Sequence, residues 1–294
     1  MIAGAQPLPP AATRRRRTIS RRRRGRLLAD LAGAALFAVL VFPVYWMVAT
    51  AFKTGRDILS LTPRWLPIPA TLANFQDALS RPFFWEDARN SLIVVLSAVG
   101  ISLAVAFLAA VGVARFGFRG RTAFVVMIIA VQMVPLVALI IPLFLLLNSA
   151  GLTDTLPGVI LAYLAFVLPF MIWVLRGFVV NIPVELEEAA QIDGCSRTGA
   201  FIRILFPLAA PGLVAASLYA FIQAWNEYIL AYVLLSPPQL QTLTVWLAGF
   251  TTNHGTDWGP LMAGATLTAI PVVVFFLLLQ RHFAGGLMAG AVKG

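Results

Sequence analysis

Side chains that usually carry catalysis or bind metals are scarce in this 294-residue sequence. Its two lysines, Lys53 and Lys293, do not follow glycine, so the Gly-Lys-Ser/Thr loop that cradles nucleotide phosphates is missing. The two histidines, His254 and His282, form no zinc motif, and the single cysteine, Cys195, has no disulfide partner. We therefore expect no enzyme activity, and no cofactor or metal held by this chain.

The most distinctive spacing lies in an acidic segment at 181–207, between two apolar stretches. A helix is predicted near its start, and the acidic residues of the first turns are Glu185, Glu187 and Glu188. Negative charge at that end complements the helix dipole. Pro183 suits the first turn, and Gly194 suits a left-handed stop after the helix.

A second short helix is predicted directly after the first. Ser196 caps it, it covers about 197–206, and Pro207 ends it. The two helices form an amphipathic hairpin that is too short to cross a membrane. An anionic lipid surface would repel its carboxylates, whereas the small residues Ala189 and Ala190 permit close approach. We expect a docking surface for another protein rather than a helix lying on lipid.

The elements on either side of this hairpin are membrane helices. The sequence is 60% hydrophobic and 12% charged, about half the charge of a soluble domain. A helix needs about 20 apolar residues to cross the hydrocarbon, and six uncharged stretches meet that length. We predict an all-α integral membrane protein with spans at 27–51, 91–114, 122–147, 156–177, 209–235 and 258–280.

Basic residues predict the orientation of these spans. Nine arginines lie between residues 14 and 26, whereas the connections 148–155 and 236–257 contain no lysine or arginine. Cytoplasmic segments are enriched in these residues, so both termini are predicted to be cytoplasmic. We interpret the arginine run as a topology anchor that touches the lipid bilayer, not as a nucleic-acid arm or a cleaved signal.

A few polar side chains fall inside the spans and are candidates for a substrate pathway. They are Gln132, Gln223, Asn226 and Glu227. Polar groups in a bilayer usually face a cavity or a neighbouring helix, so helix packing is the alternative role. Glu227 is expected about two turns from the outer end of the fifth span. Aromatic residues that could stack on a sugar, or anchor the span ends, are Trp46, Tyr163, Trp173 and Trp225.

Several motifs resemble those of a known family. Glu-Glu-Ala-Ala-Gln-Ile-Asp-Gly at 187–194, followed by Ile-Leu-Phe-Pro at 204–207, resembles the EAA loop of binding-protein-dependent ABC importer permeases. Further stretches resemble the maltose-permease-G-like subunits of the carbohydrate branch: Gly-Leu-Thr-Asp-Thr at 151–155, Trp-Asn-Glu-Tyr at 225–228, Thr-Leu-Thr-Val at 242–245 and Gly-Ala-Val-Lys-Gly at 290–294. The resemblance covers residues 27–294.

The resemblance implies a type I ABC importer bundle in a bacterial or archaeal cytoplasmic membrane. It implies three kinds of partner: a second, similar permease, two ATP-binding subunits that hold ATP and magnesium, and an extracytoplasmic solute-binding protein. The binding protein would dock on the outward segments 52–90 and 236–257. The cargo would be a sugar or related polyol moved inward. The coupling residues that it implies are Glu187, Glu188, Ala189, Ala190, Asp193, Gly194 and Pro207.

Two alternatives stay open: a secondary, ion-coupled transporter, and an ABC importer permease for a solute other than a sugar. A lone ionisable residue in the spans gives little material for ion coupling. The expected organisation is an arginine-rich cytoplasmic tail at 1–26, a first span with an outward segment at 27–85, the permease core at 86–281 and a cytoplasmic tail at 282–294.

Overall fold

A computed structural model describes the backbone of residues 14–290 and the side chains of residues 27–281. The long helices are α1 (Arg14–Ala51), α4 (Phe84–Arg115), α5 (Arg121–Gln132), α6 (Leu136–Ser149), α7 (Leu156–Val180), α10 (Phe206–Trp225) and α13 (Trp258–Gly290). The short elements are α2 (Gly55–Ile58), α3 (Ala73–Ser80), α8 (Glu185–Ile192), α9 (Arg197–Ala200), the π-helix η1 (Phe201–Leu205), α11 (Ile229–Leu234), the 3-10 helix η2 (Pro238–Leu240), α12 (Leu243–Ala248), and the paired strands β1 (Thr251–Thr252) and β2 (Gly255–Thr256). The predicted lipid contacts of the arginine-rich tail and the motif at 290–294 fall outside the described side chains.

Six apolar segments in the described part of the chain are long enough to cross a bilayer. Five are single helices, and the sixth is the pair α5 and α6 counted as one span. The predicted all-α membrane fold is therefore confirmed, and the number of spans equals the predicted six when α5 and α6 count as one.

The third span is not the continuous helix that the sequence predicted at 122–147. α5 and α6 meet at an angle of 102° across residues 133–135. Pro135 has extended backbone angles, with φ −60° and ψ 131°. Proline lacks an N–H donor and disfavours helical geometry in the residue before it, so the helix stops here. By contrast, Pro142 and Pro169 are accommodated inside α6 and α7.

The fifth span also differs from the predicted 209–235. It is helical from Arg197 to Trp225, then breaks before the short helix α11. Pro207 therefore does not end the second helix of the hairpin, as the sequence had suggested. It lies in the first turn of α10, directly after the π turn of η1. A π turn is wider than an α turn, which gives the proline ring room without breaking the helix.

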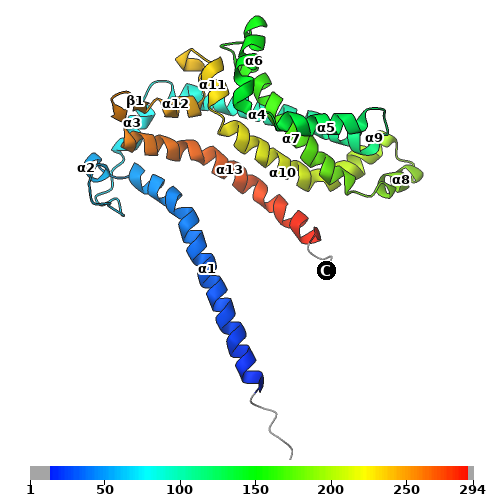
Figure 1. The fold of residues 1–294 in the computed structure, drawn as a ribbon, viewed down its shortest axis with the longest axis horizontal. Helices are drawn as coiled ribbons and strands as arrows, with labels where there is room; N and C mark the ends of the chain where they lie inside the picture. Colours follow the sequence, from blue (N-terminus) through cyan, green and yellow to red (C-terminus); the bar gives the residue numbers. More distant parts are fainter. Residues whose placement is uncertain (1–13, 291–294) are drawn as a thin grey trace, which may run out of the picture.

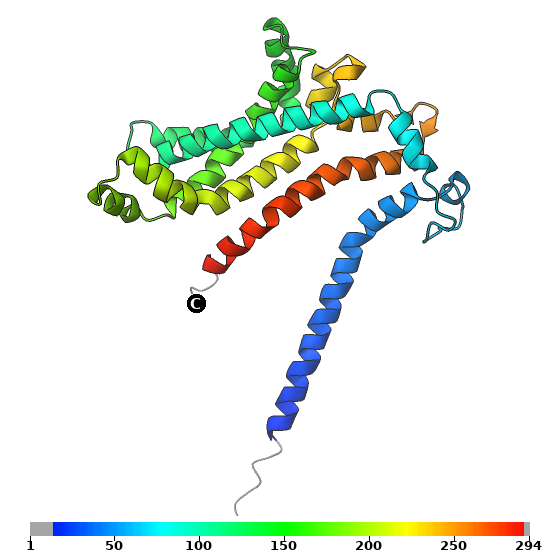
Figure 2. The ribbon, with the colours of Figure 1, turned by 180° about the vertical axis from the view of Figure 1, so that it is seen from behind.

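The core of the bundle is built on α4 and α7, which pack along their length, with α10 against both. Its buried small residues include Ala98, Ala106, Ala110, Ala162, Ala216 and Ala220. Small side chains let membrane helices approach closely, where van der Waals packing is the main attraction. α13 lies between α10 and α1 in both views (Figures 1 and 2). α1 contacts α13 near the carboxyl end of α1. Toward its amino end α1 diverges from α13, so the apolar surface of α1 is left uncovered by this chain.

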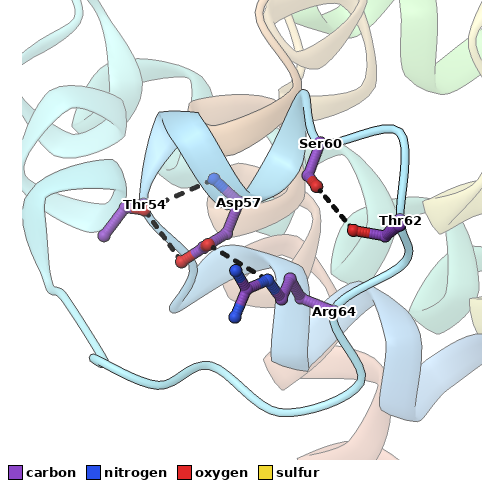
Figure 3. Close-up of polar contacts among 5 residues, drawn as sticks. All are labelled: Thr54, Asp57, Ser60, Thr62 and Arg64. Atoms are coloured by element: carbon purple, nitrogen blue, oxygen red, sulfur yellow. Dashed lines mark hydrogen bonds and ion pairs between the residues drawn. The ribbon is translucent and has the colours of Figure 1, made fainter.

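The two ends of the bundle differ. One end carries α8 and α9, and we call it the α8 end; the other carries α2, α3, α12 and the β hairpin, and we call it the α12 end (Figure 1). At the α12 end, Asp57 closes the turn around α2 by accepting from the Thr54 hydroxyl at 2.9 Å and pairing with Arg64 at 3.7 Å (Figure 3). Nearby, the buried Lys53 ammonium lies 3.7 Å from the centre of the Trp46 ring. Burial lowers the pKa of Lys53, and the neighbouring Asp57 opposes that shift.

Candidate functional site

The acidic hairpin at the α8 end has the turn and the second cap that its sequence predicted, but α8 starts at Glu185, so Pro183 precedes the helix and does not lie in its first turn. Gly194 has a φ of +93°, a left-handed conformation that suits glycine. The turn is closed by the Cys195 amide, which donates to the Ala190 carbonyl at 2.9 Å. Ser196 then caps α9 by accepting from the Gly199 amide at 3.0 Å. These contacts hold α8 and α9 in a fixed hairpin.

One surface of this hairpin is open to a partner. Glu188, Ala189 and Asp193 are exposed, and Ala190 is half-buried. Among the described side chains, neither Glu188 nor Asp193 forms an ion pair. Ile192 beside them is 87% exposed. The open surface therefore combines carboxylates, small residues and a large apolar side chain, which suits protein docking better than water or lipid alone.

Glu187 faces the bundle instead. Its carboxylate pairs with the Arg115 guanidinium at 2.7 Å, and the two side chains are 15% and 12% exposed. Arg115 also donates to the Ile182 carbonyl at 2.9 Å. Sequence reasoning placed Glu187 with the docking residues and missed Arg115. Arg115 is the first charged residue after a long uncharged span, which was a usable signal for the end of α4. It gave no signal for the residue with which Arg115 pairs.

The hairpin continues into the membrane helix α10 without a break. η1 joins α9 to α10, and its Phe201 and the adjoining Phe206 both pack on Phe107 of α4, with ring centres 5.5 and 5.7 Å apart. This connection and the Arg115 pair attach the hairpin to two membrane helices, α10 and α4.

A cavity of about 710 Å³ lies where the α5–α6 break meets α7, α10 and α11. All four predicted pathway residues line it: Gln132, Gln223, Asn226 and Glu227. Aromatic side chains line it as well, namely Phe166, Phe170, Tyr219 and Tyr228. Phe170 and Tyr219 stack with ring centres 3.8 Å apart. Amides beside aromatic faces are the groups expected in a site for a small polar solute with an apolar face.

Glu227 has a structural task within this cavity wall. It lies in the break between α10 and α11, not two turns inside a helix as predicted, and it is 8% exposed. Its carboxylate accepts from the Leu230 and Ala231 amides at 2.8 and 3.2 Å and so caps α11. This supports the packing alternative for Glu227.

The three amides of the cavity keep more of their hydrogen-bonding capacity. Asn226 donates to Ile222 of its own helix at 2.9 Å, and Gln132 donates to Ile128 at 3.4 Å. The side chains of Asn226 and Gln132 therefore each retain a carbonyl oxygen that can accept a hydrogen bond from a solute.

None of the four aromatics singled out from the sequence lines the cavity. Tyr163 is buried in the core, and Trp225 is fixed there by donation to the Thr268 carbonyl at 3.1 Å. Trp46 packs against Trp65 at the α12 end. Trp173, on α7, is 47% exposed. The cavity aromatics were missed because their only sequence signal was proximity to Pro169 and Asn226.

Comparison with known proteins identifies this arrangement. A family model described as binding-protein-dependent transport system inner membrane component matches residues 102–288. The chain belongs to this family. It is therefore a multi-pass inner membrane component of an ABC transport system, in agreement with the resemblance found in the sequence.

Relatives across this family of permeases cover nearly the whole chain. The chain is 44% identical over 270 residues to the diacetylchitobiose uptake system permease protein DasC of Streptomyces coelicolor, covering 92% of this chain and 98% of that one. It is 35% identical to the trehalose transport system permease protein SugB of Mycobacterium tuberculosis, covering 86% and 93%. A bacterial ABC transporter that imports alginate has the same fold, with a TM-score of 0.76, 23% identity and coverage of 94% and 100%.

Proposed function

We propose that this chain is a permease subunit of an ATP-driven importer that moves a sugar or related glycoside inward across the cytoplasmic membrane of a bacterium or archaeon. The relatives named for diacetylchitobiose and trehalose support the sugar class. The single observation that carries the proposal for this chain is the cavity of about 710 Å³, in which three amides and four aromatic rings converge. Neutral sugars offer hydroxyls to amides and C–H faces to rings.

The energy for transport comes from other chains. The sequence has no phosphate-binding Gly-Lys-Ser/Thr loop, so ATP and magnesium belong to two partner subunits at the cytoplasmic face. A second permease completes the pathway, and an extracytoplasmic binding protein delivers the sugar at the α12 end. The arginine distribution supports this orientation, with the α8 end and both termini in the cytoplasm.

Within this assembly, the exposed hairpin surface is the contact for an ATP-binding subunit. Glu188 and Asp193 offer carboxylates, Ala189 and Ala190 permit a close fit, and Gly194 sets the turn. Glu187 acts from the opposite side of α8, where Arg115 ties the hairpin to α4. Pro207 and η1 connect the hairpin to α10. Movement of the ATP-binding subunit then moves α4 and α10, and α10 carries part of the cavity wall with it.

Reconstitution tests this proposal directly. The permease pair, the ATP-binding subunits and the binding protein from the same gene neighbourhood are placed in vesicles, and uptake of labelled diacetylchitobiose, trehalose and other neutral glycosides is measured. We expect uptake of at least one glycoside only with ATP on the cytoplasmic side. Uptake driven by a sodium or proton gradient without ATP would support a secondary transporter instead. ATP-dependent uptake confined to amino acids or ions would refute the sugar class.

A further inference from the structure

A second hollow lies on α7, between the cavity and the α8 end. It has a volume of about 380 Å³ and is lined by Trp173, Val174, Arg176, Gly177, Phe178 and Asn181. We call it the α7 notch. A Cβ built on Gly177 would meet no atom within 4 Å, so the missing side chain at this position leaves open space in the notch.

Arg176, which lines the notch, has a hydrogen-bond donor without an acceptor. Its Nε is buried and makes no hydrogen bond, and no ion pair involving Arg176 is formed among the described side chains. Arg115, the corresponding cation at the end of α4, has both a carboxylate and a carbonyl partner. The buried Nε has lost its hydration without gaining a partner, and the rest of this half-buried side chain lines the notch, where a ligand that accepts hydrogen bonds can meet it.

The notch continues the cavity along one face of α7. Phe166 and Phe170 line the cavity, and Trp173 and Gly177 line the notch. Their spacing of four, three and four residues places them on one stripe of the helix. The rings of Phe170 and Trp173 are 6.4 Å apart, and Trp173 is 47% exposed. A solute leaving the cavity toward the α8 end therefore meets the Trp173 ring directly after Phe170.

The side chains of the notch match a sugar in kind. Trp173 offers an aromatic face for the C–H side of a pyranose ring. Arg176 presents a planar fork of donors that fits two neighbouring hydroxyl oxygens. Asn181 uses its amide group to donate to the Gly177 carbonyl at 2.9 Å, which leaves its Oδ1 free to accept from a hydroxyl. The volume also falls in the range of small-ligand pockets, which starts at about 300 Å³.

We propose that the α7 notch is a second sugar subsite, occupied as the solute passes from the cavity to the cytoplasm, with Trp173, Arg176 and Asn181 as its contacts. This inference rests on the proposed function and adds a residue-level exit route to it. A phospholipid phosphate is the other group that suits an arginine at this depth. The sugar is favoured because the notch shares its stripe of α7 with the cavity.

Protection of an introduced thiol tests the subsite. Cys195→Ala removes the native thiol, and Gly177→Cys places a new one in open space in the notch. The assembled complex is held in phosphatidylcholine nanodiscs, and its alkylation by a maleimide is timed with and without the glycoside that the vesicles accumulate, diacetylchitobiose or trehalose. The sugar is expected to slow alkylation several-fold. Gly112→Cys, at the end of α4 and also in open space, is the matched control and is expected to show no protection.

A second arm assigns the contact to Arg176. Arg176→Gln removes a charged donor, which is expected to raise the sugar concentration for half-maximal protection about tenfold. Arg119→Gln, an exposed arginine in the α4–α5 connection, is expected to leave it unchanged. If Gly177→Cys does not assemble, Val174→Cys reports from a residue that lines the notch but is not one of its three proposed contacts.

Two results would overturn the subsite. One is equal alkylation with and without a sugar that the same complex transports. The other is protection by phosphatidylglycerol in place of phosphatidylcholine, with none by sugar, which would make the notch a lipid site. Failure of the proposed function is seen separately, as the lack of ATP-dependent uptake of any glycoside.

Discussion

Gly194 is the residue on which the geometry of the hairpin depends most. Its φ of +93° is costly for any residue with a Cβ, whereas the space around it is open. A substitution there therefore acts through the backbone and not through a clash. The turn fixes how α8 presents Glu188 and Asp193, so its shape should matter for coupling more than for folding.

Gly194→Ala is expected to destabilise the turn by about 1–2 kcal/mol, the cost of a left-handed conformation. ATP hydrolysis stimulated by the binding protein, and uptake, should both fall, while the amount of assembled complex stays close to normal. The measurement is ATPase activity with and without binding protein. Gly112→Ala, a helical glycine with open space around it, is the control. Normal stimulation of ATP hydrolysis and normal uptake in Gly194→Ala would contradict a role for this turn in coupling.

Asn226 and Glu227 are neighbours in sequence with different tasks. Glu227→Ala removes the acceptor for two amides of α11 and should lower stability by about 1 kcal/mol, as loss of a helix cap does. Asn226→Ala should leave assembly intact and reduce uptake, because Asn226 lines the cavity and its side chain's only hydrogen bond among the described residues is the one its amide nitrogen donates. Thermal unfolding of the purified complex, combined with uptake, separates the two. Lost assembly in Asn226→Ala would show a packing role instead.

At the scale of the elements, what the sequence predicted depended on the range of the interactions involved. Gly194 and Ser196 act within four residues, and their turn and cap were predicted from residue type alone. The pair between Arg115 and Glu187 joins residues far apart in sequence, so spacing could not reveal it. The break at Pro135 was missed because prolines inside other spans, such as Pro169, are tolerated when the bundle supports them.

The π turn of η1 is the element that sets the orientation of the hairpin. Deleting Ile202, which is exposed, would convert this turn to an α turn. Without the wide turn, the Pro207 ring would meet the backbone of the preceding turn, which would distort the join between the hairpin and α10 and strain the pair between Glu187 and Arg115. We expect basal ATPase activity to persist while stimulation by the binding protein is lost. Ile202→Ala keeps the register and should behave like the unaltered protein; equal loss in both variants would contradict a role for the π turn.

Across the whole molecule, the fold separates the cavity from the hairpin surface that we propose as the contact for the ATP-binding subunit. The cavity lies at the junction of α5, α6, α7, α10 and α11, and the hairpin lies at the far ends of α7 and α10. The six spans were predictable because membrane helices need long apolar runs. The hairpin was predictable from the residue types in its motif. The cavity itself was predictable only through its polar residues, since its shape comes from two helix breaks whose positions depend on packing.

Photo-cross-linking from the hairpin is the most direct test of the central claim, that an ATP-binding subunit grips this surface. A photoreactive side chain in place of Ile192, which is 87% exposed beside Asp193, is activated in native membrane vesicles. The same group in place of Leu61, fully exposed at the α12 end, serves as the control. We predict an adduct between position 192 and the ATP-binding chain, and none from position 61. Adducts at position 192 with lipid alone, or no adduct, would contradict the account.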